Sequence, residues 1–318
     1  MQALDEVKEL RKLWGGFWSS RVLLTANNFR VFDHLKSPVT ASEIARKLKL
    51  DRRAAGILLD ALTGLGLLKK SGDRYRNTPA SNRFLVKGTP LYQGDIIKHA
   101  DILWQNWSEL DKTVKTGKPS RRARNHTSFI LGMHNIASLK APDVIGALDL
   151  KGVKHALDLG GGPGTYSIEL ARKGIAVTLF DMPETVKIAK GVVGKSGLKN
   201  IDFIRGDFTA DDIGKGYDLI LISQILHAFS VADSTRLLRK CKAALNPGGR
   251  IAIQEFYLDK DRTHPVPSAL FSVNMLVNTP GGRCYAPSEM KQWLKQTGFS
   301  GMKEKMLDDT VLVLGRTR

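Results

Sequence analysis

Cysteine and long apolar runs are what this sequence most clearly lacks. Its 318 residues include two cysteines, Cys241 and Cys284, too few for a disulfide framework and typical of a reducing compartment. No apolar run approaches the ~20 residues that a membrane-spanning helix needs. The first residues, MQALDEVKELRK, alternate in charge and lack the apolar core of a signal peptide. We therefore expect a cytoplasmic protein without a membrane span.

Acidic residues are scarce relative to basic ones. The chain has 31 aspartates and glutamates against 49 lysines and arginines, which gives a net charge of +18. Such a chain could attract nucleic acid, an anionic membrane surface or an acidic small molecule, or its charges could simply be solvated. Hydrophobic residues make up 42% of the sequence, a usual value for a globular protein with a sizeable core. The length predicts about two domains.

The first domain is expected over residues 1–120 and is predicted to be mostly helical. Residues 7–36 carry apolar side chains at helical spacing, with an interruption expected at Gly15 and Gly16. Residues 91–117 form another helical stretch that contains Trp104 and Trp107.

The middle of this domain has the order helix, helix, hairpin. Thr40 precedes Glu43 by three residues, which is the spacing of a capping box, and Asp51 can cap the next helix. Residues 67–78 are typical of two short strands around a Ser-Gly-Asp turn. This order indicates a winged helix. The second helix is expected to bury one face made of Ile57, Leu58, Leu62 and Leu65.

The second domain is expected over residues 121–318, after the basic connector RRARNH at 121–126 and a helix over roughly 127–140. From residue 154 onward, strands alternate with helices, which predicts an α/β fold with a doubly wound, mostly parallel sheet. A final helix and hairpin can extend the sheet edge. The expected strands are 155–159, 176–180, 201–207, 217–223, 249–256 and a hairpin within 301–315; the expected helices follow Gly164 and cover 184–197, 233–245 and 287–298.

A glycine-rich turn follows the first of these strands. Asp158 is followed by Gly160, Gly162 and Gly164, the pattern D-x-G-x-G-x-G. Glycine lets the backbone approach a ligand closely. A dinucleotide fingerprint, G-x-G-x-x-G, fails because its third glycine would be Thr165. A carboxylate in the loop suits a cationic ligand better than a pyrophosphate, which it would repel.

Two further sites follow in the order expected of one ligand. Asp181 ends the next strand, where a carboxylate can accept hydrogen bonds from both ribose hydroxyls. After the third strand, Asp207 could meet an adenine amino group and Phe208 its face. A cationic group, a ribose and an adenine together describe S-adenosylmethionine.

With these motifs, the chain resembles the class I, Rossmann-like S-adenosylmethionine-dependent methyltransferases. More specifically, it resembles the winged-helix O-methyltransferases of plant phenolics, hydroxyindoles and bacterial secondary metabolites. The resemblance covers nearly the whole chain and implies a homodimer formed through the N-terminal domain. Its most specific segments are LDLGGGPG, GDF, ILHAF, LNPGGRIAIQEF and NTPGGR.

The resemblance also implies roles for residues around the loop. The glycines would hold the methionine end of the cofactor, Asp181 the ribose and Asp207 the adenine, with Met182 and Ser223 as further cofactor contacts. No metal is expected, because displacement at a sulfonium needs none.

His227 lies just past the carboxyl end of the strand YDLILIS, on the ligand side of the sheet. A phenol has a pKa near 10, so a positioned imidazole that removes its proton contributes about 10²–10⁴ in rate. The resemblance places the catalytic histidine of the family here, and it places an orienting carboxylate at Glu255.

Several positions depart from the family pattern. A second glutamate that flanks the histidine in plant members is replaced by Cys284, and the Asp and Trp after the histidine by Ala228 and Phe229. The lysine four residues before the histidine is Ser223. These differences concern the activation of the base and the identity of the acceptor.

Family geometry implies an acceptor pocket for a small, aromatic or enolic molecule, closed by the dimer partner. Arg283 and the basic run at 121–124 favour an acidic acceptor. The candidate lining residues are Phe129, Met133, Phe271, Asn274, Met275 and Trp104.

Three alternatives stay open at this point. One is methyl transfer to carbon or nitrogen on the same scaffold. Another is a nucleic-acid-binding regulator, because Arg52, Arg53 and the wing residues Lys69, Lys70, Arg74 and Arg76 make the winged helix basic; no specific nucleic acid is expected, because the helix face is rich in Ala, Leu and Gly. The third is a cofactor-binding protein with other chemistry.

Overall fold

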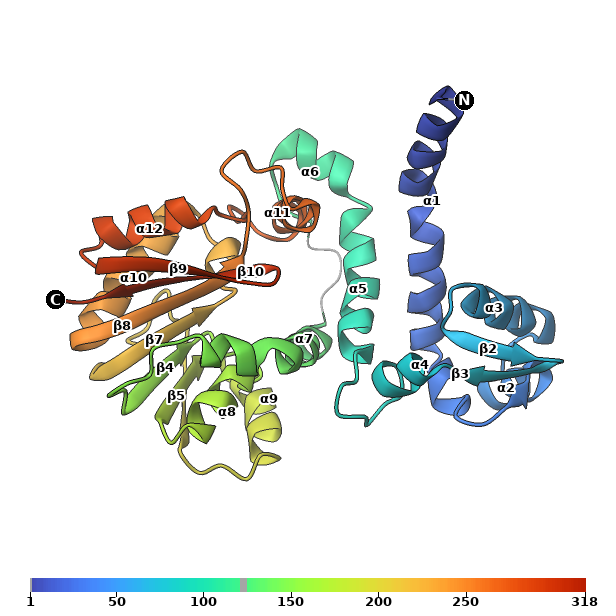
Figure 1. The fold of residues 1–318 in the computed structure, drawn as a ribbon, viewed down its shortest axis with the longest axis horizontal. Coiled ribbons are helices and arrows are strands. Elements are labelled where there is room, and N and C mark those ends of the chain that lie inside the picture. The colour runs from blue at the N-terminus through green and yellow to red at the C-terminus, as the bar shows by residue number, and fades with distance from the viewer. Residues whose placement is uncertain (1, 121–124) are drawn as a thin grey trace. The chain divides into compact units, whose positions relative to one another are not determined.

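The computed structural model describes residues 2–120 and 125–318, and the chain forms two compact units, Met1–Ile102 and Leu103–Arg318 (Figure 1). The domain boundary that we expected between residues 120 and 121 lies after the division between these two units, and it stays a prediction. The basic run at 121–124 lies outside the described residues.

The N-terminal unit is helical and carries a small antiparallel sheet with the strand order β1-β3-β2. The hairpin and the two preceding helices confirm the expected order. Glu43 N–H donates to Thr40 Oγ1 (3.2 Å) and Thr40 N–H to Glu43 Oε2 (2.6 Å), so the capping box is formed. Asp51 accepts from Ala54 N–H at 2.8 Å, as expected of a cap. The elements are α1 (Gln2–Asn28), η1 (Val31–His34), β1 (Val39–Thr40), α2 (Ala41–Leu48), α3 (Arg52–Gly64), β2 (Leu68–Ser71), β3 (Arg74–Asn77), α4 (Pro79–Phe84) and α5 (Gly94–Trp107), whose last residues belong to the second unit.

One expectation for this unit was wrong, and a second holds only in part. Helix α1 continues through Gly15 and Gly16 without interruption, because glycine keeps its backbone N–H and only weakens a helix by about 1 kcal/mol per residue. On α3, Leu62 is buried and Leu58 packs half-buried against the core as expected, whereas Ile57 is 55% exposed and Leu65 is also exposed. Ala55 and Leu59 are buried in their place. Packing in this unit therefore sets the rotation of α3, which its apolar residues alone leave undetermined.

The second unit is built on a seven-stranded sheet. Its elements are α6 (Leu110–Thr116), α7 (His126–Gly146), β4 (His155–Leu159), α8 (Thr165–Arg172), β5 (Ala176–Asp181), α9 (Pro183–Gly194), β6 (Ile201–Arg205), β7 (Tyr217–Ser223), η2 (Leu226–Ala228), α10 (Val231–Ala244), β8 (Leu245–Phe256), α11 (Val266–Asn278), α12 (Pro287–Gln296), β9 (Ser300–Leu307) and β10 (Thr310–Arg316). Every strand expected from the sequence is present. Helix α11 is an addition that the sequence interpretation did not contain.

The strand order β6-β5-β4-β7-β8-β10-β9 confirms the doubly wound fold. The chain runs outward from β4 through β5 to β6, then returns to the other side of β4 for β7 and β8, all in parallel. The C-terminal hairpin adds β10 antiparallel to β8. This reversal leaves a crevice between the carboxyl ends of β4 and β7, where open α/β sheets bind ligands.

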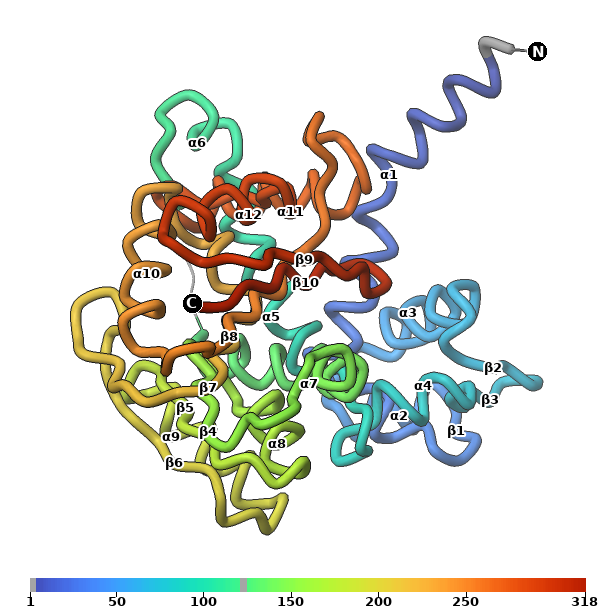
Figure 2. The backbone as a smooth tube through the Cα atoms, turned by 60° about the vertical axis from the view of Figure 1, so that its left-hand side comes forward, coloured from blue at the N-terminus to red at the C-terminus, as the bar shows by residue number. Residues whose placement is uncertain are grey.

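Helices cover both faces of this sheet (Figures 1 and 2). On one face, Ile220 and Ile222 of β7 pack with residues of α10 and α12. On the other face, Leu219 and Leu221 of the same strand pack with residues of α7, α8 and α9. Alternate side chains of β7 thus pack into the cores on the two faces of the sheet. This packing fixes the position of the strand end that borders the crevice.

Among residues 2–120 and 125–318, no helix is both long and apolar enough to cross a bilayer. The cytoplasmic location stays a prediction.

Candidate active site

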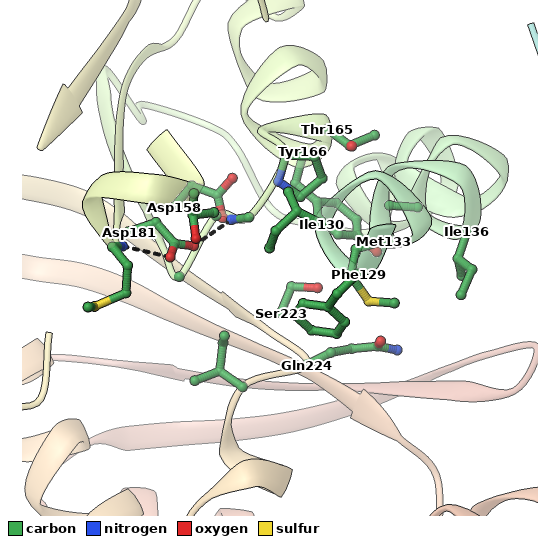
Figure 3. Close-up of a pocket in the computed structure, with 18 of the residues that line it drawn as sticks. Phe129, Ile130, Met133, Ile136, Asp158, Thr165, Tyr166, Asp181, Ser223 and Gln224 are labelled. Carbon is green, nitrogen blue, oxygen red and sulfur yellow. Dashed lines mark hydrogen bonds between the residues drawn. The ribbon is translucent and has the colours of Figure 1, made fainter. Parts of the chain in front are cut away.

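A cavity of about 260 Å³ lies at the crevice beyond the carboxyl ends of β4, β5 and β7 (Figure 3). One wall is a face of α7, and the opposite wall is the glycine turn between β4 and α8. Most of its surface is apolar. It is lined by His126, Phe129, Ile130, Met133, Ile136, Ala137, Lys140, Asp158, Gly160, Gly161, Gly162, Pro163, Thr165, Tyr166, Asp181, Met182, Thr185, Phe208, Ser223, Gln224 and Ile225.

The glycine turn is shaped for close approach. Gly160 has φ +68°, and a Cβ there would lie 2.6 Å from Ile225 Cδ1. Gly162 has φ +54°, and a Cβ there would meet nothing nearer than 4.0 Å, because it would enter the open cavity. Gly164 precedes α8 and does not line the cavity; it gives space to Val193 instead. The turn therefore leaves room that a side chain at 162 would fill.

Asp158 is the most unusual polar group of the site. Its side chain is 1% exposed, and Ser167 Oγ donates to its Oδ2 at 2.6 Å. Its Oδ1 is buried without a hydrogen-bond partner. Burial, together with the nearby charge of Asp181, raises the pKa of Asp158 to about 6. A buried carboxylate oxygen without a donor fits a cationic or donor group of a bound ligand.

Asp181 stands at the end of β5 and is held by the backbone. Gly162 N–H donates to its Oδ2 at 2.8 Å and Met182 N–H to its Oδ1 at 2.7 Å. Burial raises its pKa, and these backbone donors act in the opposite direction. The carboxylate is thereby oriented into the cavity, with Met182 beside it.

Of the two residues expected to contact the adenine, only Phe208 lines the cavity. Phe208 lines the cavity, with its ring 5.8 Å from that of Phe229. Asp207 is exposed and does not line the cavity, and its Oδ1 accepts from Thr209 N–H (2.8 Å) and Thr209 Oγ1 (2.6 Å). These hydrogen bonds lower its pKa. The adenine role of Asp207 stays a prediction.

His227 and Glu255 form a buried pair. His227, in the 3₁₀ turn after β7, is 9% exposed, and its Nδ1 lies 2.7 Å from Glu255 Oε2. Its backbone N–H donates to Glu255 Oε1 at 3.3 Å, so both carboxylate oxygens are directed at this residue. Neighbouring strands β7 and β8 bring the two together. The ring of Phe271 packs edge-on against the imidazole at 5.0 Å between centroids.

Cys284 is buried near this pair. Its N–H donates to Ser272 Oγ at 3.1 Å. Burial raises the pKa of the thiol to about 11, with the charge of Glu255 acting in the same direction. The thiol is therefore neutral at physiological pH and does not replace a carboxylate.

The expected acceptor residues are divided between two places. Phe129 and Met133 line the cavity, whereas Phe271 lies beside His227. Asn274 accepts at its Oδ1 from Trp107 Nε1 (2.9 Å), and Met275 is buried. These last two and Trp104 do not line the cavity.

Sequence reasoning missed Tyr166 and Gln224, which line the cavity, and the α7 residues Ile130 and Ile136. The helical spacing of the α7 residues with Phe129 and Met133 could have indicated them. Gln224 has φ +54°, a left-handed conformation for which the sequence has no signal. Among the described residues, no three His, Cys, Asp or Glu side chains are arranged as metal ligands.

Fold and cavity together define a class: a doubly wound domain with a glycine turn and strand-end acids that suits a nucleoside-bearing, cationic cofactor. Comparison with known families refines it. Residues 111–300 match the O-methyltransferase domain family, and residues 12–87 match the O-methyltransferase dimerisation domain. The chain belongs to the O-methyltransferase family.

Curated relatives span nearly the same length. The chain is 33% identical over 310 residues to 3-hydroxy-5-methyl-1-naphthoate 3-O-methyltransferase of Streptomyces sahachiroi, covering 92% of this chain and 90% of that protein. It is 32% identical over 323 residues to acetylserotonin O-methyltransferase of Gallus gallus, covering 93% of each. The structure of human N-acetylserotonin methyltransferase in complex with S-adenosylmethionine superposes with a TM-score of 0.90 at 28% identity, covering 98% of this chain and 97% of that one.

The protein is thus an S-adenosylmethionine-dependent O-methyltransferase with an N-terminal dimerisation domain, and it methylates hydroxyl groups of aromatic small molecules. Methyl transfer to oxygen, the activity favoured by the sequence, is thereby confirmed in place of transfer to carbon or nitrogen and of cofactor binding with other chemistry.

Proposed function

We propose that His227 is the general base of the reaction, that Glu255 orients it, and that no metal takes part. The observation that supports this proposal is the buried contact of both Glu255 oxygens with His227, at Nδ1 and at the backbone N–H. A carboxylate on Nδ1 keeps that nitrogen protonated and leaves Nε2 as the free base.

Bound S-adenosylmethionine supplies a methyl group on a positively charged sulfur. His227 Nε2 would take the proton of the acceptor hydroxyl as the hydroxyl oxygen forms a bond to that methyl carbon and the bond between this carbon and sulfur breaks. Glu255 stabilises the imidazolium that results, because its charge lies 2.7 Å from Nδ1 in a buried setting. The leaving group is a neutral thioether, so no Lewis acid is needed to stabilise it.

We place the cofactor in the cavity along the glycine turn. Asp158 would meet the ammonium of the methionine end and Asp181 the ribose hydroxyls, with Phe208 against the adenine. The partnerless Oδ1 of Asp158 and the open space at Gly162 support this fit. Met182 and Ser223, which also line the cavity, would contact the cofactor from either side. For Asp207 to reach the adenine, it would have to exchange its hydrogen bonds with Thr209.

We infer that the acceptor is a hydroxylated aromatic molecule of one or two fused rings, bound between α7 and α11. Phe129 and Met133 offer apolar surface on α7, and Phe271 offers it next to the base. The relatives that act on a hydroxynaphthoate and on acetylserotonin support this size. Arg283 gives little support to an acidic acceptor, because it forms an ion pair with Glu289 (2.7 Å).

The test compares His227→Ala with Glu255→Gln in a methylation assay on such acceptors. We expect turnover to fall by about two to four orders of magnitude for His227→Ala, and by less for Glu255→Gln. Calorimetric titration should show S-adenosylmethionine binding unchanged in both variants. Turnover that survives His227→Ala would refute the general-base role. The same assay with a chelating agent should give unchanged turnover, and loss of activity there would refute metal independence.

A further inference from the structure

The segment NTPGGR, one of the most specific of the sequence, has no role in the proposed reaction. It begins at the last residue of α11, leads toward α12 and runs against the 3₁₀ turn η2 that carries His227. A Cβ on Gly282 would lie 2.2 Å from the His227 carbonyl oxygen and 3.0 Å from the carbonyl carbon of Ala228. The φ of Gly282 is not left-handed, so glycine is required here by the close approach and not by the backbone conformation. The loop is therefore in direct backbone contact with the turn that carries the base.

The loop is tied to α11 by its own hydrogen bonds. Thr279 Oγ1 accepts from Gly282 N–H at 3.0 Å and donates to the carbonyl of Met275 at 2.8 Å. Two residues further along, the backbone N–H of Cys284 is bonded to the Ser272 hydroxyl, also on α11. These bonds hold Gly282 against the turn η2.

Tyr285 makes a second contact with the same turn. It is 2% exposed, and its hydroxyl donates to the Phe229 carbonyl at 2.6 Å. Its ring packs edge-on against Trp293, with 4.7 Å between centroids, and the Arg283 guanidinium lies 4.2 Å from its centroid. Arg283 is fixed in turn by its ion pair with Glu289. The packing of the ring therefore determines where the hydroxyl meets the turn.

The turn η2 depends on such outside contacts for its position. It is three residues long, and 3₁₀ turns have poorer hydrogen-bond geometry than α-helices. Glu255 holds the imidazole at Nδ1 and the backbone at the N–H of His227. The carbonyl side of the turn is contacted by Gly282 and Tyr285 instead. A shift of about 1 Å in a reacting group can cost about 100-fold in rate, so these contacts bear on the reaction.

We propose that Gly282 and Tyr285 are positioning residues for the general base. Their contacts with the carbonyls of His227 and Phe229 hold the turn where His227 Nε2 faces the acceptor hydroxyl, while Glu255 orients the ring. The inference rests on the proposed role of His227 as the base. Neither Gly282 nor Tyr285 lines the cofactor cavity, so cofactor affinity should not depend on them.

Two variants test the two contacts in single-turnover methylation of naphthols. Gly282→Ala places a methyl group against the His227 carbonyl, so we expect the rate to fall about 100-fold. Tyr285→Phe keeps the buried ring and removes one hydrogen bond, so we expect a smaller fall, of up to about 10-fold. With nitrated naphthols that are ionised at the assay pH, both variants should approach the wild type, because no proton has to be removed. An equal loss on both kinds of acceptor would overturn the proposal.

Combination with His227→Ala separates this inference from the proposed function. If Gly282 acts through His227, Gly282→Ala should cause no further loss of rate in the His227→Ala protein. A further loss of about 100-fold in that protein would overturn the positioning role alone. A His227→Ala protein that keeps the wild-type rate would overturn the general base and this inference together.

Gly249→Ala is the matched control for an effect on stability alone. A Cβ on Gly249 would lie 2.8 Å from the carbonyl oxygen of Asn246, a backbone clash of the same kind, toward the amino end of β8 and away from Glu255. We expect thermal unfolding to show reduced stability of both alanine variants, and the methylation assay to show a loss for Gly282→Ala only. Equal losses of methylation would overturn the proposal. If Gly282→Ala does not fold, the acceptor series with Tyr285→Phe decides by the same criterion.

Discussion

Asp158 illustrates at the scale of one residue how binding competes with stability. One of its oxygens accepts from Ser167, and the other faces the cavity without a donor. Its folded pKa of about 6 lies above the value near 3.9 of an unfolded aspartate. Between these two pH values the folded protein keeps this proton, whereas the unfolded protein has lost it. The free energy of unfolding therefore falls as the pH rises from about 4 to about 6, and stays at its lower value above that.

Asp158→Asn should relieve this cost in the ligand-free protein. A shift from 3.8 to about 6 corresponds to about 3 kcal/mol at most. We expect the variant to be more stable than the wild type at pH 8, with the difference shrinking to near zero at pH 4. Denaturant unfolding at several pH values measures this, with Asp149→Asn, at an exposed acid, as control. A variant that is less stable than the wild type at pH 8 would contradict the assignment.

At the scale of elements, alternation and turn chemistry predicted the strands of the catalytic domain and the helix caps of the N-terminal unit. The strand at 217–223 and the caps at Thr40 and Asp51 are found as expected. Local sequence signals failed where tertiary packing determines the structure. Ile57 of α3 faces outward although we expected it to be buried, and α11 was not predicted. In the site, the close contact of His227 with Glu255 agrees with the expectation, but the engagement of Asp207 by Thr209 has no signature in the sequence.

Replacing two glycines by alanine should change the stability of the protein in opposite directions. Gly15 lies in the middle of α1, and a Cβ there would meet nothing within 4 Å. Gly15→Ala should therefore raise stability by up to about 1 kcal/mol. Gly164 has φ +80°, and a Cβ there would lie 2.8 Å from Val193 Cγ2. Gly164→Ala should lower stability by about 1–3 kcal/mol. Thermal unfolding of both variants decides, and stabilisation by Gly164→Ala would be the contrary result.

At the scale of the whole molecule, α1 carries a row of exposed apolar side chains. Val7, Leu10, Trp14 and Phe17 recur at helical spacing and are exposed, within or beside the dimerisation-domain match at 12–87. We propose that the protein is a homodimer and that this face of α1 belongs to the interface.

Replacing two of these side chains tests the assembly. We expect Trp14→Glu combined with Phe17→Glu to give monomers in sedimentation experiments, because two buried carboxylates would oppose association. Met306→Glu, at an exposed apolar residue of β9, serves as the control and should remain dimeric. A double variant that stays dimeric would remove α1 from the interface.

The most direct test of the account is the dependence of turnover on the acidity of the acceptor hydroxyl, measured with His227→Ala and the wild type. A general base matters only while the hydroxyl still carries its proton. For hydroxyls with a pKa near 10, we predict that the variant loses about two to four orders of magnitude. For acceptors already ionised at the assay pH, its turnover should approach that of the wild type. An equal loss across the whole series would contradict the role of His227 as the base.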